Sequence, residues 1–192
     1  MTTTKVAVFG GAFDPPHDGH AHVAKYLSQH YDQVWVMPAY RHMYDKKMTS
    51  YDHRLQMCEI LFQDIENIAV SDYEKQFPDL RGSFDILSQL SEHYPTKQFY
   101  FVIGQDNANT VEKWKNYQRL IQEFSFIILP RTGYPEKHCW YKNPPHQFVD
   151  DLSTLPEISS TKIRDRLKNN GVTNHLSPRV FSYIKNNKLY AC

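Results

Sequence analysis

The sequence predicts an α/β protein built on a doubly wound parallel sheet, with helices on both faces and a small C-terminal helical region. Short runs rich in β-branched and aromatic residues alternate with stretches that repeat apolar residues every three or four positions. This alternation is typical of a parallel sheet crossed by helices. The strand-like runs are apolar throughout, as expected where helices cover both faces of a sheet. The predicted core is therefore Rossmann-like.

The predicted elements follow in order along the chain. Strand-like runs lie at residues 5–9, 33–38, 68–71, 98–103 and 124–130. Helix-period stretches lie between them at residues 21–31, 52–64 and 83–94. Residues 132–156, rich in Pro, Tyr and His, are predicted to be irregular. Two helices are expected near the C-terminus, one at residues 160–168, which Gly171 helps to end, and one at residues 178–186, which begins with Pro178.

Length and composition limit the classes of protein that remain. A chain of 192 residues has the size of one ordinary domain, so a single domain over residues 1–192 is predicted, with its C-terminal helical part at about 157–192. The formal net charge of +1 comes without a basic stripe, which disfavours nucleic acid as a partner.

Cysteine usage and hydropathy indicate the compartment. Cys58, Cys139 and Cys192 form no CxxC pair, which favours a reducing environment. The N-terminus does not resemble a signal peptide, and no apolar run approaches the roughly 20 residues of a membrane span. A cytoplasmic protein without a membrane partner is expected, and a homo-oligomer is left open.

The segment GGAFDPPHDGH, residues 10–20, lies between the first strand and the first helix. In an open parallel sheet this turn is the usual phosphate-binding position. Gly10 and Gly11 lack a Cβ atom, so the backbone there can approach a ligand closely or adopt positive φ. A helix that begins near Asp18 or Gly19 adds free N–H groups and the positive end of its dipole.

His17 and His20 are three positions apart, which places both imidazoles on one face at the start of this helix. There they can donate hydrogen bonds to phosphate oxygens. A metal site is the alternative, but zinc needs three or four ligands, and only Asp14 and Asp18 are near in sequence. No metal-ligand set is therefore predicted. An ordinary strand-to-helix turn is the plainer interpretation of the glycines.

A second candidate anion site is the segment ISSTKIR, residues 158–164. Ser159 is a favourable N-cap, while Ser160 and Thr161 offer hydroxyl and N–H groups at another positive helix end. Arg164 lies four residues after Ser160 on the same helix face, so its guanidinium can reach what the serine touches. Capping alone would explain Ser159. Two anion-binding helix ends together indicate a long polyphosphate between them.

Both segments resemble the signatures of a nucleotidyltransferase superfamily that joins a nucleoside triphosphate to a phosphorylated or acidic acceptor. The stretch FVIGQDNANTVEKWKNYQRL, residues 101–120, and the ending LSPRVFSYIKNNKLY are similar to the nicotinate/nicotinamide mononucleotide adenylyltransferases. The resemblance extends from about residue 5 to residue 190. It implies that Asp106 holds the adenosine ribose and that Trp114 stacks on the pyridine ring. A core anchor is the alternative for Trp114.

The resemblance implies three overlapping sets of site residues. ATP contacts fall on Gly10, Gly11, Ala12, Phe13, His17, His20, Gly104, Asp106, Ile158, Ser159, Ser160, Thr161 and Arg164. Mononucleotide contacts fall on Gly11, Ala12, Phe13, Lys47, Ser83, Trp114 and Arg131. The catalytic set is His17, His20, Arg164 and a loop lysine, either Lys46 or Lys47.

Two departures from the family pattern stand out. Ala12 replaces the usual Thr or Ser, which removes one hydroxyl near the phosphates. The family reads roughly SYTxDTL where this chain reads RGSFDIL, so Ser83 keeps a hydroxyl that would cap the third helix, while Gly82 replaces the tyrosine. Arg81 can serve a nicotinate carboxylate or point into water. The choice between the acid and the amide of the pyridine ring therefore stays open.

The predicted activity is transfer of AMP from ATP to nicotinate or nicotinamide mononucleotide, which yields deamido-NAD or NAD and pyrophosphate. Mg²⁺ is expected to enter with ATP, bridging phosphate oxygens. The alternatives are another enzyme of the superfamily, such as a pantetheine-phosphate adenylyltransferase or a cytidylyltransferase, and a non-catalytic module that senses NAD or ATP.

Overall fold

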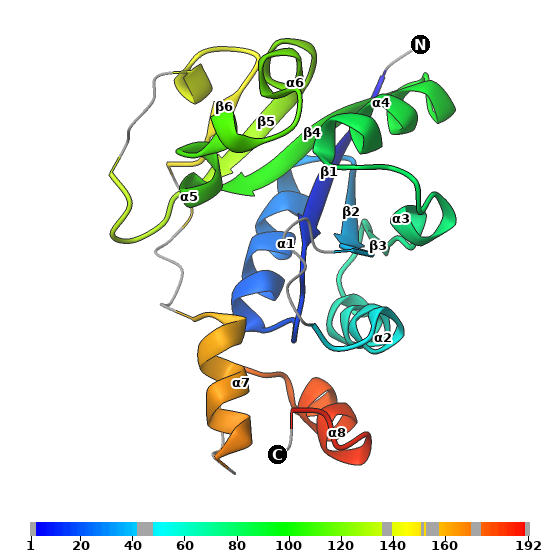
Figure 1. Ribbon diagram of the computed structural model, residues 1–192, viewed down its shortest axis with the longest axis vertical. Helices are drawn as coiled ribbons and strands as arrows, with labels where there is room; N and C mark the ends of the chain where they lie inside the picture. Colours follow the sequence, from blue (N-terminus) through cyan, green and yellow to red (C-terminus); the bar gives the residue numbers. More distant parts are fainter. Residues whose placement is uncertain are drawn as a thin grey trace.

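The protein is described by a computed structural model, which covers residues 3–41, 48–135, 140–150, 152, 158–169 and 174–190. Its centre is a six-stranded sheet in the order β3-β2-β1-β4-β5-β6, with every pairing parallel (Figure 1). The strands are β1 (Thr4–Gly11), β2 (Gln33–Pro38), β3 (Ile68–Val70), β4 (Lys97–Gly104), β5 (Ser125–Leu129) and β6 (Gln147–Phe148).

The helices that flank the sheet are mostly those that the apolar periodicity predicts. The predicted ones are α1 (Asp18–His30), α2 (Tyr51–Phe62) and α4 (Ser83–His93). The sequence did not indicate α3 (Tyr73–Gln76), α5 (Gln105–Ala108), the 3₁₀ turn η1 (Val111–Lys113) or α6 (Tyr117–Glu123). Helix α1 begins at Asp18, one of the two predicted positions. The α/β prediction is confirmed.

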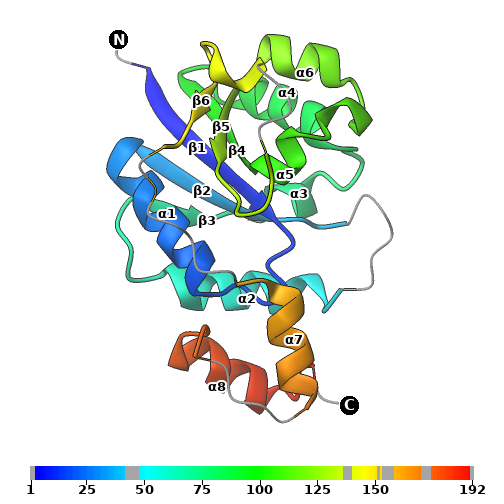
Figure 2. The ribbon, with the colours of Figure 1, turned by 90° about the vertical axis from the view of Figure 1, so that its left-hand side faces the viewer.

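Alternating side chains of β1 enter two separate cores. Ala7 and Phe9 pack with Leu27 of α1, Phe62 of α2 and their neighbours. Val6 and Val8 point to the other face and pack with α4 and α6, as in a strand buried on both sides. Figure 2 shows α1 and α4 on opposite sides of the sheet. The sheet is thus the middle of three layers.

The predicted irregular segment after the fifth strand contains regular structure. A 3₁₀ turn, η2, spans Trp140–Lys142, and β6 adds a sixth strand that pairs with β5 through Ile127 and Ile128. The prediction of an irregular segment is therefore wrong for these residues. Two residues are too few to show the alternation of apolar and polar residues by which a strand is recognised in a sequence. Strand β6 is defined instead by its pairing with β5.

Helices α7 (Ser160–Lys168) and α8 (Pro178–Asn186) have the predicted bounds. They lie beyond the carboxyl ends of the strands, next to α2 (Figures 1 and 2). A third core cluster joins them to α2 through Met57, Ile163, Leu167, Leu176, Val180 and Ile184. This cluster fixes where the N-terminus of α7 lies relative to the end of β1.

Candidate active site

The strand order reverses at β1, which is where an open parallel sheet is expected to have its ligand crevice, at the carboxyl ends of the strands. The chain runs from β1 outward to β3, then returns to the other side of β1 and runs outward again from β4 to β6. Ligands of open parallel sheets bind where the strand order reverses, because the loops from the two neighbouring strands diverge there. The turn after β1 and the turn after β4 meet at this point.

Gly10 and Gly11 are the last two residues of β1, and they pair with Met37 and Pro38 of β2. The residue of this turn with positive φ is Phe13, at 47°. A Cβ atom on Gly11 would lie 3.2 Å from the Phe13 ring, which is a tight contact, whereas one on Gly10 would lie in ordinary van der Waals contact with Phe101 at 3.4 Å. Neither glycine has a positive φ, so close packing favours glycine at position 11, and the free-protein geometry does not require it at position 10.

His17 and His20 stack at the start of α1, with ring centroids 3.8 Å apart and ring planes inclined by 28°. The His17 N–H donates to His20 Nδ1 at 3.1 Å. This bond assigns the proton of a neutral His20 to Nε2. The Nδ1 atom of His17 is buried and has no hydrogen-bond partner among the described residues.

Both imidazoles are held neutral. Burial, with help from the positive charge of Arg131 and from His175, lowers the pKa of His17 from 6.5 to about 4. Burial also lowers the pKa of His20 well below its usual range, and His17 and Arg131 add to the effect. At neutral pH each ring therefore offers one N–H donor, and bound negative charge would favour a second proton.

The two sequence motifs meet at this turn, as predicted. Ser160 Oγ donates to the Pro15 carbonyl at 2.9 Å, and Arg164 Nη1 donates to the Asp14 carbonyl at 2.7 Å. Ser160 and Arg164 thus contact adjacent carbonyls, two and three residues before His17. Ser159 caps α7, since its hydroxyl accepts the N–H of Lys162 at 3.2 Å. The N-termini of α1 and α7 consequently share one region.

Asp14 anchors the turn through groups that sequence reasoning missed. Its side chain is 3% exposed, and its two carboxylate oxygens accept hydrogen bonds from the Tyr190 hydroxyl at 2.6 Å and from the Thr49 N–H at 3.3 Å. Arg54, 1% exposed, donates to the carbonyls of Ala12, Ala39 and Thr49. Nothing in the local sequence marks these residues, because most of their partners, such as Ala12 for Arg54 and Tyr190 for Asp14, are far away along the chain.

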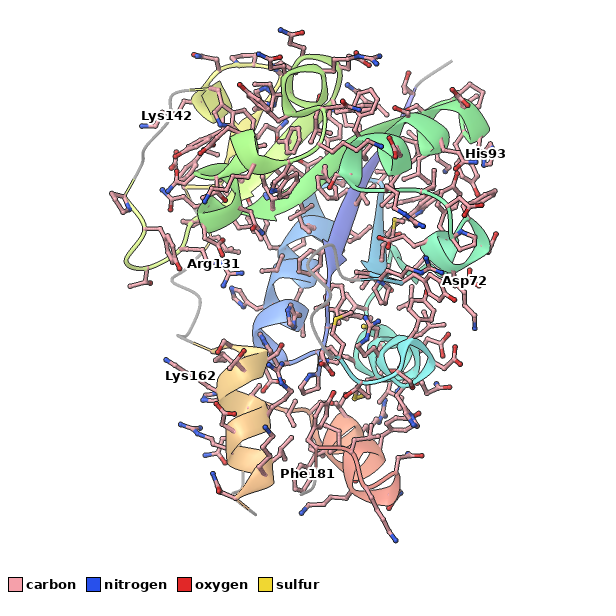
Figure 3. All side chains as sticks on the ribbon, viewed as in Figure 1. Asp72, His93, Arg131, Lys142, Lys162 and Phe181 are labelled. Atoms are coloured by element: carbon pink, nitrogen blue, oxygen red, sulfur yellow. The ribbon has the colours of Figure 1, made fainter. Side chains whose placement is uncertain are left out.

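The end of β4 brings Gly104, Asp106 and Arg131 together. Asp106 Oδ1 lies 3.3 Å from Arg131 Nε, and the Arg131 N–H donates to Gln105 Oε1 at 3.2 Å. A Cβ atom on Gly104 would collide with Asp106 Oδ1 and approach Arg131 Nε to 2.8 Å. Figure 3 shows Arg131 between α5 and α7.

Trp114 and Ser83 form the far side of the candidate site. Trp114 is partly buried and meets Phe101 edge to face at 6.3 Å, so it has both a core contact and an exposed part. Next to it, Lys115 Nζ forms a 3.0 Å ion pair with Asp85 in the first turn of α4. This ion pair brings the N-terminus of α4 and the Trp114 segment together.

The predicted capping role of Ser83 is wrong. Gly82, with φ of 87°, is the N-cap of α4, and Ser83 is the first helical residue. The Asp85 side chain accepts the Arg81 N–H at 3.1 Å, while the Arg81 guanidinium donates to the Pro78 carbonyl at 2.6 Å. Lys46 and Lys47 lie outside the described residues.

Within the described ranges, no group of three or more His, Cys, Asp and Glu side chains is arranged to hold a metal ion. Asp14 uses both carboxylate oxygens on protein donors, and Asp106 is paired with Arg131.

None of the helices in the described part of the chain is both long and apolar enough to span a bilayer.

The sheet order and the two opposed helix N-termini define an α/β protein of the nucleotidyltransferase class. Residues 8–166 match the family described as cytidylyltransferase-like. The chain is 33% identical over 190 residues to a probable nicotinate-nucleotide adenylyltransferase of Myxococcus xanthus, covering 97% of this chain and 94% of that protein. It is 32% identical over 193 residues to the nicotinate-nucleotide adenylyltransferase of Bacillus subtilis, covering 97% and 98%. The chain belongs to the nicotinate-nucleotide adenylyltransferase family.

Solved structures show the same similarity. The Plasmodium falciparum nicotinic acid mononucleotide adenylyltransferase complexed with NaAD superposes with a TM-score of 0.85 at 25% identity, over 97% of each chain. A putative nicotinate-nucleotide adenylyltransferase from Vibrio parahaemolyticus gives 0.74 at 26% identity, over 97% of this chain and 95% of the other.

Proposed function

We propose that this protein transfers AMP from ATP to nicotinate mononucleotide, which forms deamido-NAD and releases pyrophosphate. The observation that carries the proposal is the meeting of the two motifs, through the bonds from Ser160 and Arg164 to the turn that precedes His17. Two helix N-termini that share one region suit a chain of phosphates. The names of the relatives favour nicotinate over nicotinamide as the acceptor.

In this reaction a phosphate oxygen of the mononucleotide attacks the α-phosphorus of ATP. The new P–O bond forms as the bond from the α-phosphorus to the bridging oxygen of pyrophosphate breaks. Because the attacking phosphate is already an anion at neutral pH, no general base is needed. Catalysis then depends on positioning and on stabilising the charge that develops on the leaving group.

We assign the charge stabilisation to His17, His20, Ser160 and Arg164, with Lys46 or Lys47 as an additional candidate. The neutral imidazoles each supply an N–H donor. The two bonds from Arg164 to Asp14 and Thr161 use two of the five N–H groups of its guanidinium. Bound in this way, the side chain is already oriented before a phosphate arrives.

We assign the adenosine to the turn after β4 and the pyridine ring to the region of Trp114 and the start of α4. Gly104 leaves room for Asp106, which faces the crevice and would accept hydrogen bonds from ribose hydroxyls. The exposed part of Trp114 would stack on the pyridine ring, near the N–H groups at the start of α4 that include Ser83.

Mg²⁺ is proposed to enter with ATP. Magnesium commonly binds substrate phosphates and water with few protein carboxylates. The residues present suit that mode, because the Asp14 carboxylate already accepts protein hydrogen bonds and Asp106 is paired with Arg131, so substrate oxygens would supply most of the ligands. When bound, the ion neutralises phosphate charge.

A panel of acceptors tests the function. Purified protein is incubated with MgATP and nicotinate mononucleotide, nicotinamide mononucleotide or pantetheine phosphate, and pyrophosphate release is measured. We expect the highest kcat/KM with nicotinate mononucleotide. A preference for pantetheine phosphate would indicate a different enzyme of the superfamily, and tight ATP binding without pyrophosphate from any acceptor would indicate a sensor.

Location and assembly stay predictions. We propose cytoplasmic residence, which the absence of a CxxC pair among Cys58, Cys139 and Cys192 favours. A homo-oligomer is checked by light scattering of the purified protein.

A further inference from the structure

Asp14 connects three distant parts of the chain. Its carboxylate accepts hydrogen bonds from the Thr49 N–H at 3.3 Å and the Tyr190 hydroxyl at 2.6 Å. Its main-chain carbonyl accepts the 2.7 Å bond from Arg164. The next carbonyl, that of Pro15, accepts the bond from Ser160. These two hydrogen bonds between the motifs therefore adjoin one buried carboxylate.

We propose that Tyr190 is a positioning residue of the triphosphate site, and that its hydroxyl fixes Asp14 so that residues 14–15 stay against Ser160 and Arg164. This inference rests on the proposed function. Tyr190 lies 176 positions after Asp14 and beyond the last helix. Tyr190 belongs to neither of the two motifs, residues 10–20 and 158–164.

The contact joins a buried carboxylate to a partly buried phenol. Asp14 is almost fully enclosed, and burial together with the bond to Asp14 raises the pKa of Tyr190. The phenol is therefore protonated and donates to a carboxylate, which is among the stronger kinds of hydrogen bond. Without it, one carboxylate oxygen would be left buried without its donor, and the turn would have to move to find another.

Movement of the turn would affect the phosphates first. His17 follows Pro15 by two positions, and the Asp14 and Pro15 carbonyls orient Arg164 and Ser160. Small displacements of groups that position a reacting phosphate are costly in rate. The predicted contacts to the pyridine ring at Trp114 and Ser83 belong to other elements. Binding of the mononucleotide should therefore change less than binding of ATP, although residues 11–13 of the turn are predicted to contact both substrates.

Tyr183 offers a matched control. It lies on α8, and its hydroxyl makes a 2.8 Å hydrogen bond with His53 Nδ1 on α2. Tyr183→Phe removes one tyrosine hydroxyl bond from the same C-terminal region without touching the turn. Any effect that arises only from a weaker attachment of this region should appear in both variants.

The experiment compares Tyr190→Phe with Tyr183→Phe and the unmodified protein. Far-UV circular dichroism and thermal midpoints first define an assay temperature at which all three are folded. We expect Tyr190→Phe to lower kcat/KM for ATP about tenfold, with KM for the mononucleotide changed less than about twofold. Tyr183→Phe should retain the kinetic constants of the unmodified protein.

Affinity for a non-hydrolysable ATP analogue, measured by calorimetry, separates the two proposals. If the unmodified protein turns over no pyridine mononucleotide, the proposed function fails, and the role of Tyr190 is then judged on this affinity, which should weaken about tenfold in Tyr190→Phe. Unchanged kinetics and unchanged analogue affinity in folded Tyr190→Phe would overturn the proposal, as would equal losses in the two variants.

Discussion

At the scale of single residues, the stacked histidines combine two roles. The His17 N–H is one of the first donors of α1 and is satisfied by His20 Nδ1, so this pair completes the helix start. The same bond leaves the Nε2–H of His20 as the ring's donor. Burial keeps both rings uncharged in the free protein. Their place beside Arg131 then suits them to receive negative charge.

His20→Ala should lower kcat about 100- to 1,000-fold with the fold retained, since removal of one preorganised donor to developing charge typically has this effect. Pyrophosphate release under saturating substrates measures it. His22→Ala, an exposed change on the same helix, is the control and should be active. A fully active His20→Ala would remove the pair from the mechanism.

The buried His17 predicts a pH dependence of stability. Its pKa is about 4 in the folded protein and about 6.5 when unfolded. Between pH 6.5 and pH 4 the imidazole takes up a proton in the unfolded chain but stays neutral in the folded protein. The free energy of unfolding therefore decreases as the pH falls from 6.5 toward 4. The loss from this residue is roughly 3 kcal/mol.

His17→Asn isolates that contribution, because Asn is a good N-cap and does not titrate. Denaturant unfolding at pH 7 and pH 4 gives the free energy of unfolding for each protein. We expect the unmodified protein to lose more stability over this range than His17→Asn. Parallel losses in the two proteins would contradict the buried neutral imidazole.

At the scale of elements, the N-terminus of α7 is held by side chains that also face the phosphate region. Arg164 bonds the Asp14 carbonyl with one nitrogen and Thr161 Oγ1 with another, at 2.7 and 3.1 Å. A planar guanidinium can hold these partners and still present further N–H groups to a phosphate. A lysine has one ammonium group and cannot keep the same arrangement.

Arg164→Lys should therefore lower kcat/KM for ATP about 100-fold, although the charge is conserved. Arg166→Lys, an exposed change two positions later on α7, is the control. Initial rates at varied ATP measure both variants. If the two variants behave alike, Arg164 acts only through its charge.

The elements also show what a sequence can and cannot predict. The bounds of α7 and α8 and the start of α1 follow from caps and short-range periodicity, which are local properties. The convergence of His17 with Ser160 and Arg164 could be predicted because both motifs favour the same ligand. The roles of Arg54 and Tyr190 could not, since they depend on tertiary contacts. Ser83 was misassigned because Gly82 begins α4 with positive φ.

At the scale of the whole molecule, the C-terminal helices are attached to the sheet layer by apolar and polar contacts. Met57 of α2 is buried with Ile163 of α7 and Val180 of α8. The Tyr190 and Arg164 bonds to Asp14 add polar links. We propose on this basis that residues 1–192 unfold as a single domain.

Calorimetry of thermal unfolding tests this proposal. We expect one transition whose calorimetric and van't Hoff enthalpies agree. Met57→Ala, which leaves a cavity between α2 and the C-terminal helices, should cost about 2–5 kcal/mol and shift the whole transition downward. Two separate transitions, with only one moved by Met57→Ala, would show that the C-terminal helices form an independent unit.

The central position of β1 has a consequence for synthesis. One edge of β1 pairs with β2, which follows it closely, but the other edge pairs with β4, from Thr4↔Lys97 to Phe9↔Val102. A nascent chain that has left the ribosome only as far as residue 96 thus holds this central strand with one row of peptide groups still unpaired. Since unpaired strand edges invite association, the first hundred residues form the stretch of translation in which a chaperone would matter most.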